Sequence, residues 1–150
     1  MRWGAALPVG SGHPDAPRTA VWFRELWPKH GWLVAPEARC LIIVESFALP
    51  DGPTGARTRT WYGLEDQPLF AWASVWIGDR GASAYCGFLV AGAAPLSIER
   101  NMPAIVLQAE YDAWLGGDLA VAHRIARQSR PYETMYCEPT EAPWGADRTV

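Results

Sequence analysis

The chain has 150 residues, of which 49% are hydrophobic and 19% charged, a composition typical of a soluble globular protein rather than of a disordered chain. This length supports one hydrophobic core, so we expect a single domain over residues 1–150. The net charge of −3 argues against binding of duplex DNA through a broad basic face, but it leaves room for a local basic groove.

The three cysteines, Cys40, Cys86 and Cys137, lie far apart in the chain, and no CxxC pair or His/Cys cluster is present. This spacing argues against zinc and against a disulfide framework, so we expect no metal and no cofactor. No apolar run approaches the ~20 residues of a membrane span, and the N-terminus does not resemble a signal peptide. We therefore expect a cytoplasmic protein, a monomer with no membrane partner.

The basic and aromatic residues are unusual in kind. Lys29 is the only lysine among 13 basic residues, and arginine suits bidentate phosphate binding and stacking. A GC-rich genome would also favour arginine, so composition leaves both explanations open. The chain has nine tryptophans; most should lie in the core, and one or two could line a groove.

The first third of the chain contains one strong strand pattern. Residues 2–17 are rich in Gly and Pro and predict a loop after a very short element. Residues 19–32 fit one or two helical turns. Cys40 to Val44 is a short apolar run bounded by Arg39 and a turn, which predicts a strand buried on both faces, with Glu45 and Ser46 at its end.

The remaining elements predict a β-rich domain. Strands are expected over residues 57–62, 69–76, 84–91, 98–107 and 133–137, and helices over 108–115 and from the cap Asp118 to Arg127. The fold class is therefore α+β, with a mixed or antiparallel, barrel-like β core and a few short helices.

Several stretches in order resemble one known family. Arg39-Cys40-Leu41-Ile42 runs into Ser46-Phe47-Ala48-Leu49-Pro50, and Asn101-Met102-Pro103-Ala104-Ile105-Val106-Leu107 precedes Trp114-Leu115. Between them stand Thr60-Trp61-Tyr62-Gly63-Leu64 and the run 69–76, and Arg2-Trp3-Gly4 opens the chain. This pattern resembles the SOS response-associated peptidase family, the abasic-site-processing domain, from residue 2 to about Leu115.

The resemblance implies a protein that binds single-stranded DNA and forms a thiazolidine cross-link with an abasic site. In the family an N-terminal cysteine is the nucleophile, an Asn orients the reacting groups, and a Glu and a His move protons. Such a reaction needs a 1,2-aminothiol to trap an aldehyde and acid/base groups to carry protons through the imine.

Position by position, the family's catalytic residues are missing. Position 2 is Arg2, and the family's segment before Arg-Trp-Gly has no counterpart here. The Asn position falls on Ala20, the Glu position on Leu49 and the His position on Glu99. The resemblance therefore implies a truncated, degenerate member without an intact catalytic set.

Two acids are weak substitutes for the lost groups. Glu45 lies four residues before Leu49, on the same face if one strand runs through both, and a solvated strand-end carboxylate is the alternative interpretation. Glu99 could replace the His as a proton carrier only if burial raised its pKa; a salt bridge with Arg100 is the alternative.

Three hypotheses follow. The first is that Arg2, Trp3, Trp22 and Arg100 bind single-stranded or abasic DNA without cross-linking it. The second is a protein-interaction or regulatory module with no role in nucleic-acid binding. The third is that an upstream Met-Cys segment belongs to the natural protein, which would restore the nucleophile but not the Asn, Glu or His.

Overall fold

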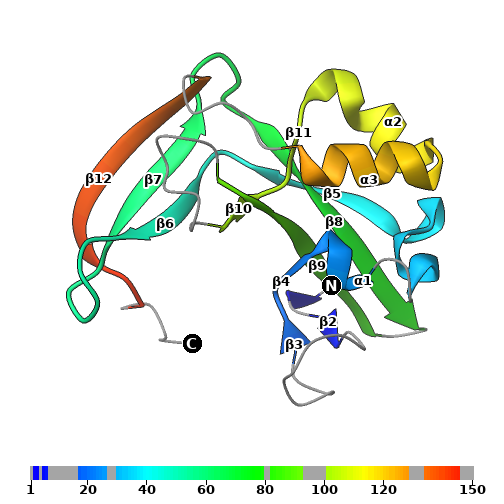
Figure 1. The fold of residues 1–150 in the computed structure, drawn as a ribbon, viewed down its shortest axis with the longest axis horizontal. Coiled ribbons are helices and arrows are strands. Elements are labelled where there is room, and N and C mark those ends of the chain that lie inside the picture. Colours follow the sequence, from blue (N-terminus) through cyan, green and yellow to red (C-terminus); the bar gives the residue numbers. More distant parts are fainter. Residues whose placement is uncertain are drawn as a thin grey trace.

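The structure, a computed structural model, describes residues 2–3, 5–6, 17–26, 30–79, 82–92, 101–128 and 134–145. It is α+β, with a seven-stranded sheet, a three-stranded sheet, a small β2–β3 pair and a few short helices (Figure 1). The expected α+β class and mixed pairing are confirmed. The described strands form separate open sheets rather than a closed barrel.

The bounds of the elements follow chain order. The seven-stranded sheet contains β1 (Arg2–Trp3), β4 (Ala20–Trp22), β5 (Arg39–Val44), β8 (Phe70–Asp79), β9 (Ala82–Ala91), β10 (Asn101–Pro103) and β11 (Ile105–Val106). The three-stranded sheet contains β6 (Phe47–Asp51), β7 (Thr58–Leu64) and β12 (Met135–Pro143), and the small pair joins β2 (Ala5–Ala6) to β3 (Pro17–Arg18). The α-helices are α1 (Phe23–Leu26), α2 (Tyr111–Gly116) and α3 (Leu119–Arg127), and 3-10 turns are η1 (Gly31–Val34), η2 (Pro36–Ala38) and η3 (Gln108–Glu110).

Strand β5 forms where the apolar run predicts it, but it is not buried on both faces. It pairs in antiparallel register with β8, from Arg39 opposite Val75 to Val44 opposite Phe70. Among the described strands β8 is its one neighbour, and Ile43 is 55% exposed. The apolar run therefore marks a partly exposed strand, since an edge position leaves part of it open to solvent.

A buried arginine joins β5 to the helices. The Arg39 side chain is 4% exposed and donates to the carbonyl oxygens of Val34, Trp114 and Gly117 at 2.9, 2.5 and 2.6 Å. In return, the Trp114 indole donates to the Cys40 carbonyl at 2.9 Å. Burial lowers the pKa of the guanidinium, and the charges of Glu37 and Asp118 oppose this shift. Arg39 is thus a structural residue that holds α2 against β5.

The β8–β9 hairpin opens into a fork that the segment 101–106 fills. The two strands pair from Asp79 and Ala82 as far as Ser74 and Gly87. Beyond that point β10 pairs with β9 and β11 pairs with β8. Between them Ala104 donates its N–H to Phe88 and accepts from the N–H of Ala73, at 2.9 and 2.8 Å. The expected strand over 98–107 is confirmed from residue 101, with a break at Ala104.

Phe47 lies at the junction of the two sheets. Glu45 and Ser46 carry the chain from β5 in one sheet to β6 in the other. The Phe47 ring stacks on Tyr62 of β7 at 5.6 Å between centroids and meets Phe70 of β8 edge-on at 6.4 Å. This side chain therefore connects the small Leu49–Tyr62 cluster to the main core.

Two expectations for the helices have different outcomes. Asp118 caps α3 as predicted, because its Oδ1 accepts the Val121 N–H at 2.9 Å. The helical turns expected over residues 19–32 are only partly right. Residues 20–22 form β4, and helix begins only at Phe23, since pairing with β9 extends this part of the chain.

Candidate nucleic-acid interface

A groove lined by arginine and tryptophan lies where β4, α1, α3 and the end of β9 meet. One hollow of about 190 Å³ contains Trp22, Arg24 and Arg127 over an apolar floor that includes Phe23 and Val90. An adjoining hollow of about 570 Å³ shares Arg127 and adds His123, Arg124 and Gln128. We call these two hollows together the arginine groove.

Strand pairing fixes the tryptophan of this groove. β4 runs parallel to β9 with Trp22 opposite Leu89. The next residue, Phe23, is buried together with Leu26, and this burial anchors α1 and leaves Arg24 exposed. The Arg24 guanidinium lies over the Trp22 ring at 4.6 Å from its centroid. The chain thus presents a cation and an aromatic ring as one stacked unit.

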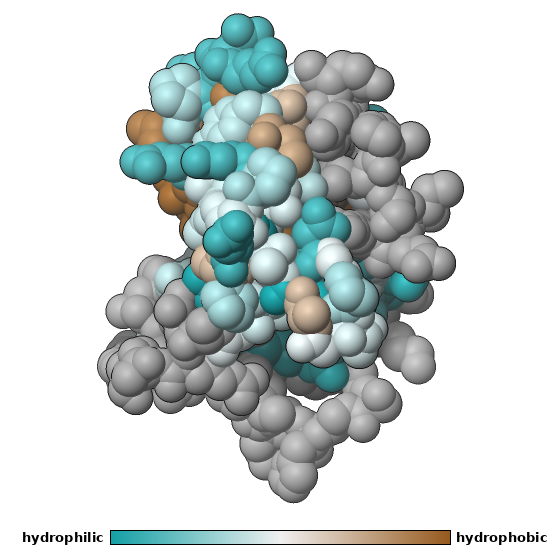
Figure 2. Space-filling view, turned by 90° about the vertical axis from the view of Figure 1, so that its left-hand side faces the viewer, coloured by the Kyte–Doolittle hydropathy of each residue, from teal (hydrophilic) through white to brown (hydrophobic). Residues whose placement is uncertain are grey.

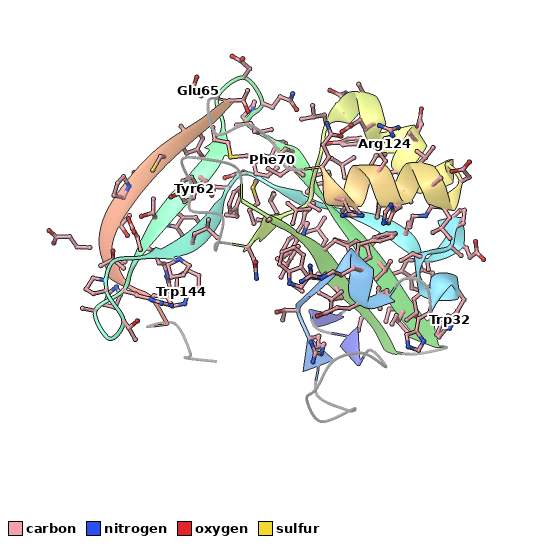
Figure 3. All side chains as sticks on the ribbon, in the orientation of Figure 1. Trp32, Tyr62, Glu65, Phe70, Arg124 and Trp144 are labelled. Carbon is pink, nitrogen blue, oxygen red and sulfur yellow. The ribbon has the colours of Figure 1, made fainter. Side chains whose placement is uncertain are left out.

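Helix α3 supplies the second side of the groove. Ala122, Ile125 and Ala126 are buried, so the same helix exposes Arg124 and Arg127. Figure 3 shows Arg124 on this helix. His123 meets the Phe23 ring edge-on at 5.4 Å, and its Nε2 lies 3.4 Å from Nη1 of Arg127. The imidazole therefore connects the helix to α1 and orients the arginine.

The arginines of the groove are free to bind an anion. Within the described part of the chain Arg24, Arg124 and Arg127 form no ion pair, and their contacts are those with Trp22 and His123. Glu25 is exposed on α1 but does not line either hollow. Unpaired guanidinium groups around an aromatic ring favour a phosphate-bearing ligand.

The structure brings part of the predicted DNA-binding set together. β1, which contains Arg2 and Trp3, and β4, which contains Trp22, both pair in parallel with β9. The backbones of these three residues therefore follow one edge of the same strand. Arg100 and Glu99 lie outside the described residues.

The positions that match the family's catalytic residues do not form a site. Ala20 lies in β4 of the seven-stranded sheet, opposite Gly87. Leu49 lies in β6 of the three-stranded sheet, opposite Thr60, and is 7% exposed. Glu45 is exposed at the bend after β5. The same-face argument for Glu45 and Leu49 is wrong, because the chain changes sheet between them.

Sequence reasoning missed Arg24, Arg124 and Arg127. The helical pattern from Asp118 to Arg127 places two of these residues in the last turn of α3, but nothing in the sequence places that turn beside Trp22. Arg24 follows Trp22 by two residues, a spacing that also fits a single helix. The proximity of α1 to α3 is a tertiary contact that no local pattern reveals.

The three cysteines differ in their surroundings, which gives a simple prediction. Burial raises the pKa of the Cys40 thiol to about 11 and that of Cys86 to about 12, so both stay protonated near neutral pH. Cys137 is exposed on β12, in contrast to the expected core position. We expect an aromatic disulfide reagent at pH 7.5 to modify one thiol rapidly in the folded protein and all three in denaturant. Rapid loss of a second thiol from the folded protein, or unchanged reactivity in Cys137→Ser, would contradict this assignment.

The described part of the chain has no group of three or more His, Cys, Asp or Glu side chains that could hold a metal ion. None of its helices is long and apolar enough to cross a membrane.

Comparison with known proteins gives the fold alone. No family model matches the chain, and no curated protein matches it. Among solved structures, a protein from Bacteroides thetaiotaomicron is similar with a TM-score of 0.73 and 15% identity, over 91% of this chain and 66% of that one. A protein and a phage-related protein, both from Bordetella bronchiseptica, are similar with TM-scores of 0.70 and 0.69 and 17% identity. They cover 93% and 92% of this chain, which spans 75% and 68% of theirs. The chain is thus shorter than each of these neighbours.

Proposed function

We propose that the protein is a relative of the SOS response-associated peptidases that binds single-stranded DNA non-covalently through the arginine groove. The observation that carries this proposal is the Trp22–Arg24 stack beside Arg127 in one hollow, with no carboxylate partner in the described part of the chain. Proteins that bind single strands combine aromatic stacking platforms with cations that follow the phosphates.

The dimensions of the groove favour a single strand. Its aromatic hollow of about 190 Å³ is smaller than the roughly 300–1,000 Å³ of typical enclosed ligand sites. A base of a single strand can enter it from solvent, whereas the bases of a duplex are already stacked. The overall charge of −3 supports a local, strand-sized contact rather than a broad duplex-binding face.

The same residues support binding without cross-linking. A thiazolidine needs a thiol and a free amine on one residue. Within the described residues Cys40 and Cys86 are protonated by burial, and Cys137 lies inside a strand with its nitrogen in a peptide bond. We therefore expect no shifted band on a denaturing gel after incubation with an abasic oligonucleotide.

The binding test uses fluorescence anisotropy of a labelled single-stranded oligonucleotide at several salt concentrations. Trp22→Ala should weaken binding by about tenfold, because one base stack is worth roughly 1–3 kcal/mol. The double substitution R24Q/R127Q should weaken binding and reduce the magnitude of the slope of log affinity against log salt by about 1.4, or about 0.7 for each phosphate that is no longer neutralised.

The matched control is Arg59→Gln, which removes one arginine charge from β7 in the other sheet. It should leave both the affinity and the salt slope close to those of the parent protein. No binding by the parent protein at low salt, or an equal loss of affinity in the control variant, would contradict the proposal and favour a protein-interaction module. A band on the denaturing gel would contradict the non-covalent mode.

A further inference from the structure

A second hollow lies at the far end of the three-stranded sheet. It has a volume of about 530 Å³ and is lined by the turn 54–58 and by Pro143 and Trp144. Figure 3 shows Trp144 at this end, at the opposite side of the molecule from Arg124. The hollow is therefore separate from the arginine groove.

Backbone contacts hold the two sides of this hollow together. The turn between β6 and β7 has glycines with positive φ, Gly52 at 89° and Gly55 at 93°, a region that glycine enters at little cost. Across from it, Pro143 of β12 pairs with Thr58. The Trp144 N–H then donates to the Arg57 carbonyl at 2.8 Å. The pairing of β12 with β7 thus makes Arg57 and Trp144 neighbours.

The Trp144 indole differs from those of the structural tryptophans. Trp72, Trp76 and Trp114 each donate their indole N–H to a backbone carbonyl. Trp144 is 45% exposed, and within the described part of the chain its ring makes no hydrogen bond or aromatic contact. A free indole face at the wall of a hollow is a stacking surface.

The polar groups of the hollow favour an anion. Arg57 is exposed and forms no ion pair in the described part of the chain. The nearby carboxylate of Asp51 already accepts the Gly52 N–H at 2.9 Å. Thr54 and Thr58 add hydroxyl groups, and nothing lies within 4 Å of where a Cβ on Gly55 would stand. A guanidinium with neighbouring hydroxyls matches the geometry of a phosphate.

We propose that this hollow binds a nucleotide, with the base stacked on the Trp144 indole and the phosphate held by Arg57 and the threonine hydroxyls. The volume of about 530 Å³ lies within the range of small-molecule sites, roughly 300–1,000 Å³. Figure 2, which looks at the molecule from this side, shows mainly hydrophilic and intermediate residues with few strongly hydrophobic ones. This surface suits a polar ligand better than an apolar partner.

The test uses protein labelled with 5-fluorotryptophan, in which substitution of Trp144 by phenylalanine assigns its ¹⁹F resonance. Adenosine 5′-monophosphate should shift that resonance saturably at up to millimolar concentration, and adenosine should bind more weakly because it lacks the phosphate. Arg57→Gln should weaken binding of the monophosphate about tenfold. R59Q, on the same strand pair but outside the hollow, should not change it.

Two further arms separate the source of the nucleotide and keep this site distinct from the groove. R24Q/R127Q should leave the response of Trp144 to the monophosphate unchanged, so failure of the DNA-binding proposal would not affect it. A shift of Trp144 with an oligonucleotide as well as with the monophosphate identifies a nucleotide within a strand, whereas a shift with the monophosphate alone identifies a free nucleotide. A Trp144 resonance that moves with neither ligand, or that responds equally in Arg57→Gln, would overturn the proposal.

Discussion

Replacing Arg39 by methionine is expected to lower the free energy of unfolding by about 3–5 kcal/mol. The substitution removes three hydrogen bonds and leaves the carbonyls of Val34, Trp114 and Gly117 without this donor. Trp114 is fully buried, so water cannot easily replace the guanidinium beside it. Urea unfolding followed by far-UV circular dichroism measures the change.

Two comparison variants separate the geometry of Arg39 from its charge. Arg39→Lys keeps a cation but cannot reach three carbonyls at once, so it should lose most of the same stability. Arg24→Met removes an exposed guanidinium and should change stability by less than about 1 kcal/mol. A loss of stability in Arg39→Met no larger than that in Arg24→Met would refute the anchoring role.

Substitution of Gly87 by alanine is expected to cost about 2–3 kcal/mol. A Cβ at this position would overlap the indole of Trp72. The indole cannot move aside freely, because its N–H donates to the Phe88 carbonyl at 2.5 Å within the β8–β9 fork. Thermal and urea unfolding both measure this destabilisation.

A double-mutant cycle tests this cause directly. Trp72→Leu should itself destabilise the protein, but Gly87→Ala should cost much less in that background because the overlapping ring is gone. Gly116→Ala is the control, since nothing lies within 4 Å of its Cβ position in α2 and alanine favours the helix. Equal costs of Gly87→Ala in both backgrounds would show that the indole is not responsible.

Local patterns predict much of the fold. The apolar run at β5, the glycine turn before β7, the strands β8 and β9 and the Asp118 cap all depend on short-range chemistry, and all are present. The C-terminal strand β12 is longer than its pattern predicts, because Pro139 and Pro143 are unfavourable within strands. Pairing at the edge of the three-stranded sheet tolerates them.

The candidate sites depend on tertiary contacts that the sequence mostly hides. Trp22 is expected at a binding surface, but Arg24 and Arg127 lie about a hundred positions apart in the sequence. Likewise, Arg57 and Trp144 meet only because β12 returns to pair with β7. Periodicity assigns a residue to a strand or a helix, whereas the neighbours of that element follow from the complete topology.

The forked hairpin also constrains the order in which the chain can fold. Residues 101–106 have no partners until β8 and β9 have met and separated at Ser74 and Gly87. Met102, Ala104 and Ile105 are then fully buried in the gap. This segment is therefore expected to dock late in folding and to leave only when the hairpin opens, so that its exchange-protected amides would report on global rather than local unfolding.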